Sequence, residues 1–344
     1  MDKYDLVYKE LRQFKKTITI NDYFQEGDMV ALLKKYPKML CYLHSFSYSS
    51  GPTSYLEIEY WNTSIPFETI FFVNDEKEMS RILYLFLKRY EEKVTFIVKD
   101  KKYFEACVSL IEAGRFDDFP YFSGLTNCNY FSFPGVGYTV YNLNISYHVP
   151  PNKLKEMEAV VDKEVSRVAS LLFEKEMPKE VKILLTHNYL AHIATYDPSY
   201  LIKGPSYFNP YSHSAYGALI SRVCVCHGFA EAFKRILNRG GVPCEIVTGV
   251  IKKSKERHAW NVVKLDDGSC YHVDVTFDDQ SKIVFNYFMK DDLYMNNDRT
   301  WAEIDCPKCH GNNNYQKIIW KYITSNKTKL VLKGIPFQVL NINF

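Results

Sequence analysis

The chain has 344 residues, of which 47% are hydrophobic and 24% are charged. This balance is that of an ordinary globular protein, long enough for two or three domains, and it excludes a disordered or collagen-like chain. The 43 Lys and Arg against 40 Asp and Glu leave a net charge of only +3. We therefore expect neither nucleic acid nor an anionic membrane as a partner. No apolar run reaches the roughly 18 residues of a bilayer span.

The cysteines and the first residues of the chain both indicate a reducing compartment. Residues 1–14 are charged and amphipathic, unlike a secretory signal. Nine cysteines, an odd number scattered through a large chain, are not typical of a disulfide framework. We therefore expect a cytoplasmic protein whose cysteines are free to pack, to bind metal or to act as nucleophiles.

The first 150 residues contain two similar stretches. LRQFKK at 11–16 ends one helical pattern and LKRYEE at 87–92 ends another, and each is followed by a β-rich run. Each stretch then closes on a strand with the same alternation, LEIEY at 56–60 and LNISY at 143–147. Because neither copy concentrates catalytic residue types, the pattern predicts a duplicated structural or recognition module. We place its two α/β repeats at residues 1–80 and 81–150.

A boundary and a long helix follow this module. Pro150 and Pro151 cannot lie inside a helix, so they mark the boundary, and Asn152 is a plausible N-cap. One apolar stripe then recurs at three- and four-residue spacing, through Leu154, Met157, Val161, Val165, Val168 and Leu172. The pattern predicts a helix of about 20 residues.

The remaining elements around the centre of the chain are less regular. A second helix is predicted from Pro178 to about Tyr196, and the Pro-, Tyr- and Ser-rich residues 198–213 are expected to form a loop. After Asn296 the chain becomes polar until a strand-like ending at 328–344. We place a catalytic domain with leading helices at 151–300 and a C-terminal extension at 301–344.

Cys226 lies where the sequence predicts the start of a helix. From Phe229, apolar residues recur at helical spacing through Leu237, and Gly240 ends the pattern. Free backbone N–H groups and the positive end of the helix dipole favour a thiolate at such a position. Gly228 is expected to leave room for a substrate to approach the sulfur. The alternative is a small buried hydrophobic residue.

A predicted β-hairpin bears on the position of His258 relative to Asp274. If residues 266–268 form a three-residue loop, Leu265 pairs with Ser269. His258 and Asp274 then become diagonal neighbours on one face of the ladder. A two-residue loop would place them on opposite faces, and the sequence leaves both registers open.

Together these residues have a chemical logic. A cysteine at a helix N-terminus, facing a histidine held by a carboxylate, has the nucleophile, base and orienting group that acyl transfer requires. The apolar Trp260 beside the histidine is expected to shield the pair from water.

The same residues resemble the transglutaminase-like superfamily, whose catalytic domain is related in architecture to papain-type thiol proteases. The resemblance covers about residues 180–295, including NYF at 286–288. It implies an α+β fold in which a helix carrying the cysteine packs on an antiparallel sheet carrying the histidine and the aspartate. Its motifs, in chain order, are AYGAL at 215–219, CHGFA at 226–230, HAWN at 258–261 and YHVDVTFDD at 271–279.

The resemblance also implies residue roles. The nucleophile is Cys226, the general acid and base His258 and the orienting carboxylate Asp274, supported by Gly228, Trp260 and Asn261. The backbone N–H of Cys226 would help to hold the oxyanion, with a Tyr or His of residues 196–216 as the second donor. Cys224, where relatives carry a small residue, is expected to pack. No cofactor is implied.

The expected function is cysteine-dependent acyl transfer on the amides of a protein or peptide substrate. We favour hydrolysis, as in a peptidase or amidase, because water is concentrated and no dedicated amine site is recognisable. The alternatives are protein-glutamine transamidation, which cross-links proteins, and a binding or scaffold protein with a vestigial triad.

Two weaker signals concern metals. Cys306, Cys309 and His310 have half the spacing of a zinc knuckle, but zinc needs four ligands, so we favour a loop with incidental thiols. Paired acids at turns lack EF-hand spacing and do not indicate calcium. The remaining histidines, His187 and His272 among them, are expected to be structural or exposed.

Overall fold

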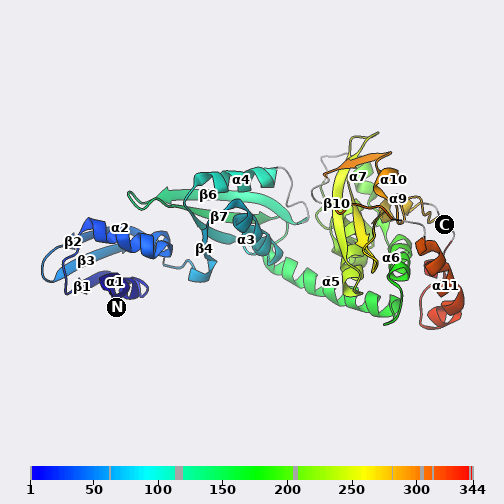
Figure 1. The fold of residues 1–344 in the computed structure, drawn as a ribbon, viewed down its shortest axis with the longest axis horizontal. Coiled ribbons are helices and arrows are strands. Elements are labelled where there is room, and N and C mark those ends of the chain that lie inside the picture. Colours follow the sequence, from blue (N-terminus) through cyan, green and yellow to red (C-terminus); the bar gives the residue numbers. More distant parts are fainter. Residues whose placement is uncertain are drawn as a thin grey trace. The chain divides into compact units, whose positions relative to one another are not determined.

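The computed structural model describes residues 2–61, 63–112, 119–203, 208–280, 282–302, 306–311, 314–340 and 342. The chain divides into two compact units, Met1–Pro151 and Asn152–Phe344, whose elements Figure 1 labels. Within the described ranges, every helix is too short or too polar to cross a lipid bilayer.

The first half of unit 1 is a small α+β layer. Its three strands pair antiparallel in the order β1-β3-β2. The elements are α1 (Lys3–Leu11), β1 (Thr17–Ile20), α2 (Glu26–Lys35), a 3-10 turn η1 (Pro37–Cys41), β2 (Leu43–Ser49) and β3 (Ser54–Tyr60).

The second half of unit 1 repeats this order of elements after a short turn η2 (Phe67–Thr69) and strand β4 (Ile70–Val73). Its sheet has the order β4-β5-β7-β6, with β4 parallel to β5 and the other pairs antiparallel. The elements are α3 (Glu76–Lys88), β5 (Lys93–Val98), α4 (Lys101–Glu112), β6 (Phe122–Ser132) and β7 (Thr139–Tyr147).

Matching contacts support the predicted duplication of these two halves. Phe14 and Tyr90, each just after the first helix of its half, have the same left-handed φ of 54°. In each half, a tyrosine hydroxyl on the last strand donates to the backbone carbonyl of the residue that follows this left-handed residue. Tyr60 donates to Lys15 and Tyr147 donates to Glu91, both at 2.8 Å. The common order α-β-α-β-β and these contacts are what a repeat would produce, and the duplication itself stays a prediction.

The predicted long helix, α5 (Pro151–Leu172), is the extended green helix of Figure 1 and lies in unit 2 except for its first residue. Pro151 is its first residue rather than a residue outside it, because a proline lacks only an N–H that has no partner at a helix start. All six residues of the predicted apolar stripe are buried. Helix α6 (Lys179–Ile193) follows, with Pro178 as its N-cap residue.

The stretch predicted as a loop at 198–213 contains a short helix, α7 (Pro198–Lys203), so that prediction is wrong over these six residues. A proline at the first helical position is compatible with a helix start. The strands β8 (Thr195–Tyr196) and β9 (Val223–Cys224) pair in parallel. A π-helical turn, η3 (Gly217–Ser221), lies between them in the sequence, just before β9.

The main sheet of unit 2 is antiparallel, with strand order β12-β11-β10-β13. Its strands are β10 (Cys244–Ile251), β11 (Arg257–Lys264), β12 (Cys270–Val273) and β13 (Arg299–Trp301). Helix α8 (Cys226–Arg239) packs against this sheet and contributes Phe229, Phe233, Ile236 and Leu237 to the core. This is the arrangement of helix and sheet that the sequence predicted.

The C-terminal region differs from its prediction. Residues 314–332 form a helix, α11 (Asn314–Leu332), and the 3-10 turn η5 (Phe337–Leu340) follows it, where the sequence suggested a strand from 328. Ile319, Ile323 and Leu330 of α11 are buried in the same core as α6 and α8. Burial of one side of α11 explains why a helix forms there, since packing overrides weak local preference.

Candidate active site

Helix α8 places Cys226 at its first turn. Val225, in extended conformation, is the N-cap residue, and Cys226 is the first helical residue. The thiol therefore lies at the positive end of the helix dipole. Cys226 is partly exposed, whereas Cys224 two residues earlier is fully buried, so Cys224 packs in the core.

The segment before α8 is held against its first turn by hydrogen bonds. The N–H of Val225 donates to the Ser212 carbonyl at 2.9 Å, and Nδ1 of His227 donates to the His213 carbonyl at 2.7 Å. Gly228 faces this segment: a Cβ added there would lie 2.5 Å from the Ser212 carbonyl oxygen. Gly228 is therefore required by close backbone packing, and its expected effect on substrate approach to the sulfur stays a prediction.

The hairpin has the register of the three-residue loop. Lys264 pairs with Cys270 and Asn261 with Val273, and Leu265 hydrogen-bonds to Ser269 at 2.9 Å. The paired strands end at Val273, because Asp274 turns out of the strand and caps a helical turn, α9 (Val275–Asp278). The register rules out the two-residue loop.

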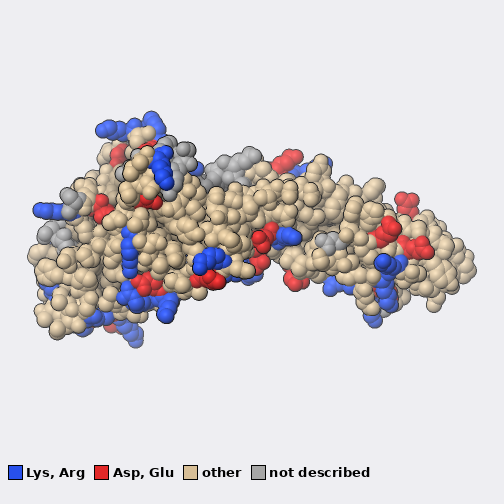
Figure 2. Space-filling view, turned by 180° about the vertical axis from the view of Figure 1, so that it is seen from behind, with Lys and Arg blue, Asp and Glu red and all other residues tan. Residues whose placement is uncertain are grey.

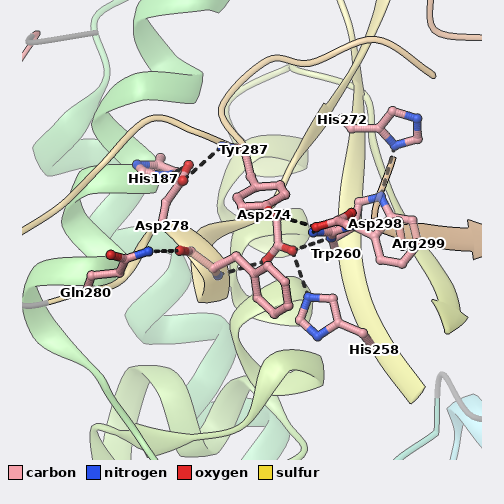
Figure 3. A network of polar contacts seen from close by, with 11 residues as sticks. His187, His258, Trp260, His272, Asp274, Asp278, Gln280, Tyr287, Asp298 and Arg299 are labelled. Carbon is pink, nitrogen blue, oxygen red and sulfur yellow. Dashed lines mark hydrogen bonds and ion pairs between the residues drawn. The ribbon is translucent and has the colours of Figure 1, made fainter. Parts of the chain in front are cut away.

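This register brings His258 to Asp274. Nε2 of His258 lies 2.7 Å from Oδ2 of Asp274, and both side chains are buried, as Figure 3 shows. The same carboxylate accepts the N–H of Phe277 at 3.2 Å through Oδ1. On its other side the guanidinium of Arg299 donates to Oδ2 at 2.5 Å.

Arg299 is a residue of the site that sequence reasoning missed. It is completely buried and is also bound by Asp298, through Nε at 2.9 Å. Its guanidinium lies over the rings of Trp260, Phe277 and Tyr287, at 5.1, 4.7 and 4.6 Å from their centroids. Arg299 lies after Asn296, in the stretch that the sequence predicted to be irregular. Because arginines are usually exposed, the residue type alone does not indicate a buried side chain.

The charges of these groups act on one another. Burial alone would lower the pKa of His258, but the charge of Asp274 and hydrogen bonds to Asp274 and Cys226 outweigh it and raise that pKa to about 10. Burial would raise the pKa of Cys226, yet the hydrogen bond and charge of His258 and the Ala259 N–H hold it below its ordinary value. This arrangement favours a thiolate–imidazolium pair.

Asp274 keeps its negative charge in this environment. Burial acts to raise its pKa, while the charges and hydrogen bonds of His258 and Arg299 lower it below the ordinary value. With Nε2 of His258 bound to Asp274, Nδ1 is the ring nitrogen left to meet the Cys226 thiol. The geometry thus unites the three residues that the sequence singled out.

Two aromatic rings enclose His258. Phe277 lies 4.5 Å from it between ring centroids, and Trp260 lies 6.0 Å away in a nearly parallel orientation. Trp260 is buried, and its expected shielding of the pair from water stays a prediction. Asn261 has a different part: its amide donates to the carbonyls of Ala230 and Glu245, at 2.9 and 3.3 Å, and ties α8 to the sheet.

Behind the triad lies a second polar chain. The indole N–H of Trp260 donates to Nδ1 of His272 at 2.9 Å, and Nε2 of His272 lies 2.9 Å from Asp292 in α10 (Asp292–Met295). Separately, the buried His187 of α6 lies 3.1 Å from Asp278 of α9. Both histidines are buried and hydrogen-bonded outside the triad. His310 is exposed, whereas Cys309 is buried.

Comparison with known proteins gives an independent assignment. Residues 167–275 match the model of the transglutaminase-like superfamily core, and no curated protein matches the chain. The chain is also similar to three solved structures, with identities of 13–16%. It spans about half the length of the first of these, 51%, so whole-protein activities are not transferred.

The first structure is a TGase, with 16% identity, a TM-score of 0.31 and 54% of this chain covered. A candidate cysteine protease from Cytophaga hutchinsonii has 14% identity and a TM-score of 0.27, with 45% of this chain and 66% of that chain covered. A candidate protease from Parabacteroides distasonis ATCC 8503 has 13% identity and a TM-score of 0.26, with 52% of this chain and 39% of that chain covered. The assignment rests on the family model: the chain contains a domain of the transglutaminase-like superfamily, and this domain carries Cys226, His258 and Asp274.

Proposed function

We propose that the protein is a thiol enzyme that catalyses acyl transfer on amide substrates of peptides or proteins. The observation that carries the proposal is the convergence of Cys226, His258 and Asp274, with a thiol pKa held below its ordinary value by the adjacent imidazolium. Cys226 is partly exposed. If the three residues only stabilised the fold, the thiol would not need to be accessible to a substrate.

The proposed reaction has two halves. The Cys226 thiolate attacks the amide carbonyl carbon, and the C–N bond breaks as the His258 imidazolium gives its proton to the departing amine or ammonia. This leaves a thioester on Cys226 and a neutral His258. Water then attacks the thioester, His258 takes its proton, and the carboxylic acid product leaves as the thiolate returns.

The acceptor decides between hydrolysis and transamidation. A lysine amine in place of water would give a new amide and cross-link two proteins. We propose hydrolysis as the main outcome because water is always present, whereas a competing amine requires a binding site that orients it.

The test uses glutamine-containing peptides and an unfolded protein as substrates, with and without a primary amine, followed by mass spectrometry. The wild-type chain should release ammonia or peptide fragments, with the amine product as a minor species. Cys226→Ala should lose turnover by about 10³-fold or more, whereas Cys128→Ala, which changes an exposed cysteine of unit 1, should keep it. Equal turnover by Cys226→Ala and wild type would exclude the mechanism, and no turnover by either would favour a binding protein.

A further inference from the structure

A group of cysteine and histidine side chains lies next to the second polar chain and outside the triad. The ligand atoms of His272, Cys306 and Cys309 all lie within 4.8 Å of one another. Two of these residues, His272 and Cys309, are completely buried. We propose that this group is a zinc site, with Cys270 as its fourth ligand.

The loop that carries two of the ligands is folded so that its sulfurs converge. The thiols of Cys306 and Cys309 both point at the carbonyl of Pro307 between them, at 3.4 Å each, and they interact with each other. The backbone of Cys309 is fixed to Asp292: its carbonyl accepts the Asp292 N–H at 2.9 Å, and its N–H donates to the carboxylate at 3.1 Å. The sulfurs are therefore held in place without a disulfide.

The histidine is prepared for one ligand position. Because the Trp260 indole can only donate, Nδ1 of His272 is an acceptor, and the ring proton lies on Nε2 and donates to Asp292. A carboxylate that holds one ring N–H while the other nitrogen binds the ion is the usual outer partner of a metal-bound histidine. Zinc at Nδ1 would take the place of the Trp260 hydrogen bond.

Cys270 lies outside the three atoms within 4.8 Å of one another, and strand geometry supports it as the fourth ligand. Cys270 and His272 are two residues apart in β12, so their side chains leave the same face of the sheet. Cys270 is buried in one cluster with Cys309, and the half-buried Cys306 packs on that cluster. Three thiolates and one imidazole form a donor set that selects zinc, in the closed tetrahedral form of structural sites.

The spacing is near what the ion requires. Tetrahedral zinc, with bonds of about 2.3 Å to sulfur and about 2.0 Å to nitrogen, places its ligand atoms roughly 4 Å apart. The three atoms within 4.8 Å need to move inward by about an ångström or less. The ion would fasten the 306–309 loop to β12.

The experiment uses the full chain. Purified protein is analysed for metal, stripped with a chelator and reloaded with Co²⁺ or Zn²⁺ alone. We expect about one zinc ion per chain and, with Co²⁺, thiolate charge-transfer bands and the visible bands of tetrahedral coordination. Cys309→Ser and His272→Gln should lose this binding. Cys128→Ser and His310→Gln, which change exposed residues, should keep it.

A measurement on the wild-type protein guards against variants that do not fold. Alkylation of Cys270, Cys306 and Cys309 should be slow with zinc bound and should accelerate several-fold after chelation, while alkylation of Cys128 should not change. The proposal would be overturned if neither the purified nor the reloaded protein held stoichiometric metal, or if His310→Gln lost metal binding while His272→Gln kept it. A Cys306–Cys309 disulfide in protein prepared without oxidant would overturn it as well.

Discussion

Among single residues, Cys226 and His258 make the most direct prediction. The imidazolium holds the pKa of the Cys226 thiol below its ordinary value, whereas partial desolvation of its sulfur raises the pKa of Cys128, although the residue as a whole is exposed. At pH 6 iodoacetamide should therefore alkylate Cys226 faster than Cys128 in the same molecule, because a larger fraction of Cys226 is thiolate, by up to about tenfold for each unit between the two pKa values. Peptide mass spectrometry over a pH series measures both rates.

His258→Gln provides the control for that experiment. Without the cation, the pH at which Cys226 becomes reactive should rise, while the profile of Cys128 should stay the same. Identical profiles for the two cysteines in wild-type protein would show that no thiolate–imidazolium pair forms.

Arg299 gives a second prediction at this scale. Arg299→Met should remove the guanidinium from the buried carboxylate of Asp274, which then keeps only His258 as its cation, and from the carboxylate of Asp298. Removing one partner of a buried ion pair costs about 3–5 kcal/mol, so the free energy of unfolding in urea should fall by this order. The surface variant Arg167→Met, which breaks a pair with Glu164 on a half-exposed side chain, should cost at most about 1 kcal/mol. Similar losses in the two variants would contradict the buried position of Arg299.

At the scale of elements, two helical glycines are a matched pair. Alanine is the better helix former at either position. At Gly228 in α8, however, the added Cβ would lie 2.5 and 3.0 Å from the carbonyl oxygens of Ser212 and Ser214, whereas at Gly27 in α2 it meets nothing within 4 Å. Gly228→Ala should therefore destabilise the protein by about 1–3 kcal/mol, and Gly27→Ala should stabilise it by up to about 1 kcal/mol. Urea unfolding compares them, and destabilisation by both would refute this account.

The two halves of unit 1 predict a second matched pair. Tyr60→Phe and Tyr147→Phe each remove a hydroxyl that donates to a backbone carbonyl at 2.8 Å. Each should cost about 1 kcal/mol, and the two values should agree within about 0.5 kcal/mol if the contacts are equivalent. Thermal unfolding of both variants gives the comparison. A loss in only one half would show that the resemblance of the two contacts is superficial.

These elements also show how far sequence reasoning reached. The sequence limited the hairpin to two registers, because side chains alternate along a strand and only the three-residue loop brings His258 and Asp274 to the same face; the structure shows that register. The C-terminal helix was missed because the apolar residues near its end look like a strand, although Tyr315, Ile319 and Ile323 have helical spacing. Arg299 could not be found, since only the assembled sheet surrounds it with Asp274 and Asp298.

For the molecule as a whole, the charges are mixed rather than segregated. On the face shown in Figure 2, Lys and Arg lie among Asp and Glu, in keeping with a net charge of +3. Electrostatic effects on stability should therefore come mainly from buried groups and depend little on salt. The buried pair of the site sets their pH dependence.

His258 and Asp274 act at opposite ends of the pH range. Because the pKa of His258 is raised from 6.5 to about 10 on folding, its contribution is complete below pH 6.5 and is lost as the pH rises toward about 10. Because the pKa of Asp274 is lowered, its contribution is present above its ordinary 3.8 and is lost as the pH falls through the folded value. Between pH 6.5 and about 10, wild-type protein should therefore lose more unfolding free energy than His258→Gln. Equal slopes in urea titrations would show that His258 is not charged in the folded state.

The hydrogen bond from the buried Asn188 amide of α6 to the carbonyl of Val339, at 3.1 Å, links residues 151 positions apart. During translation, Cys226, His258 and Asp274 leave the ribosome before Arg299, and Arg299 leaves before the residues of α11 and η5. A nascent chain thus displays its thiol before the cation and the core that hold the acid–base pair exist. Val339 and Leu340 are therefore among the last residues of this core to be synthesised, and its packing is complete only once they have joined it.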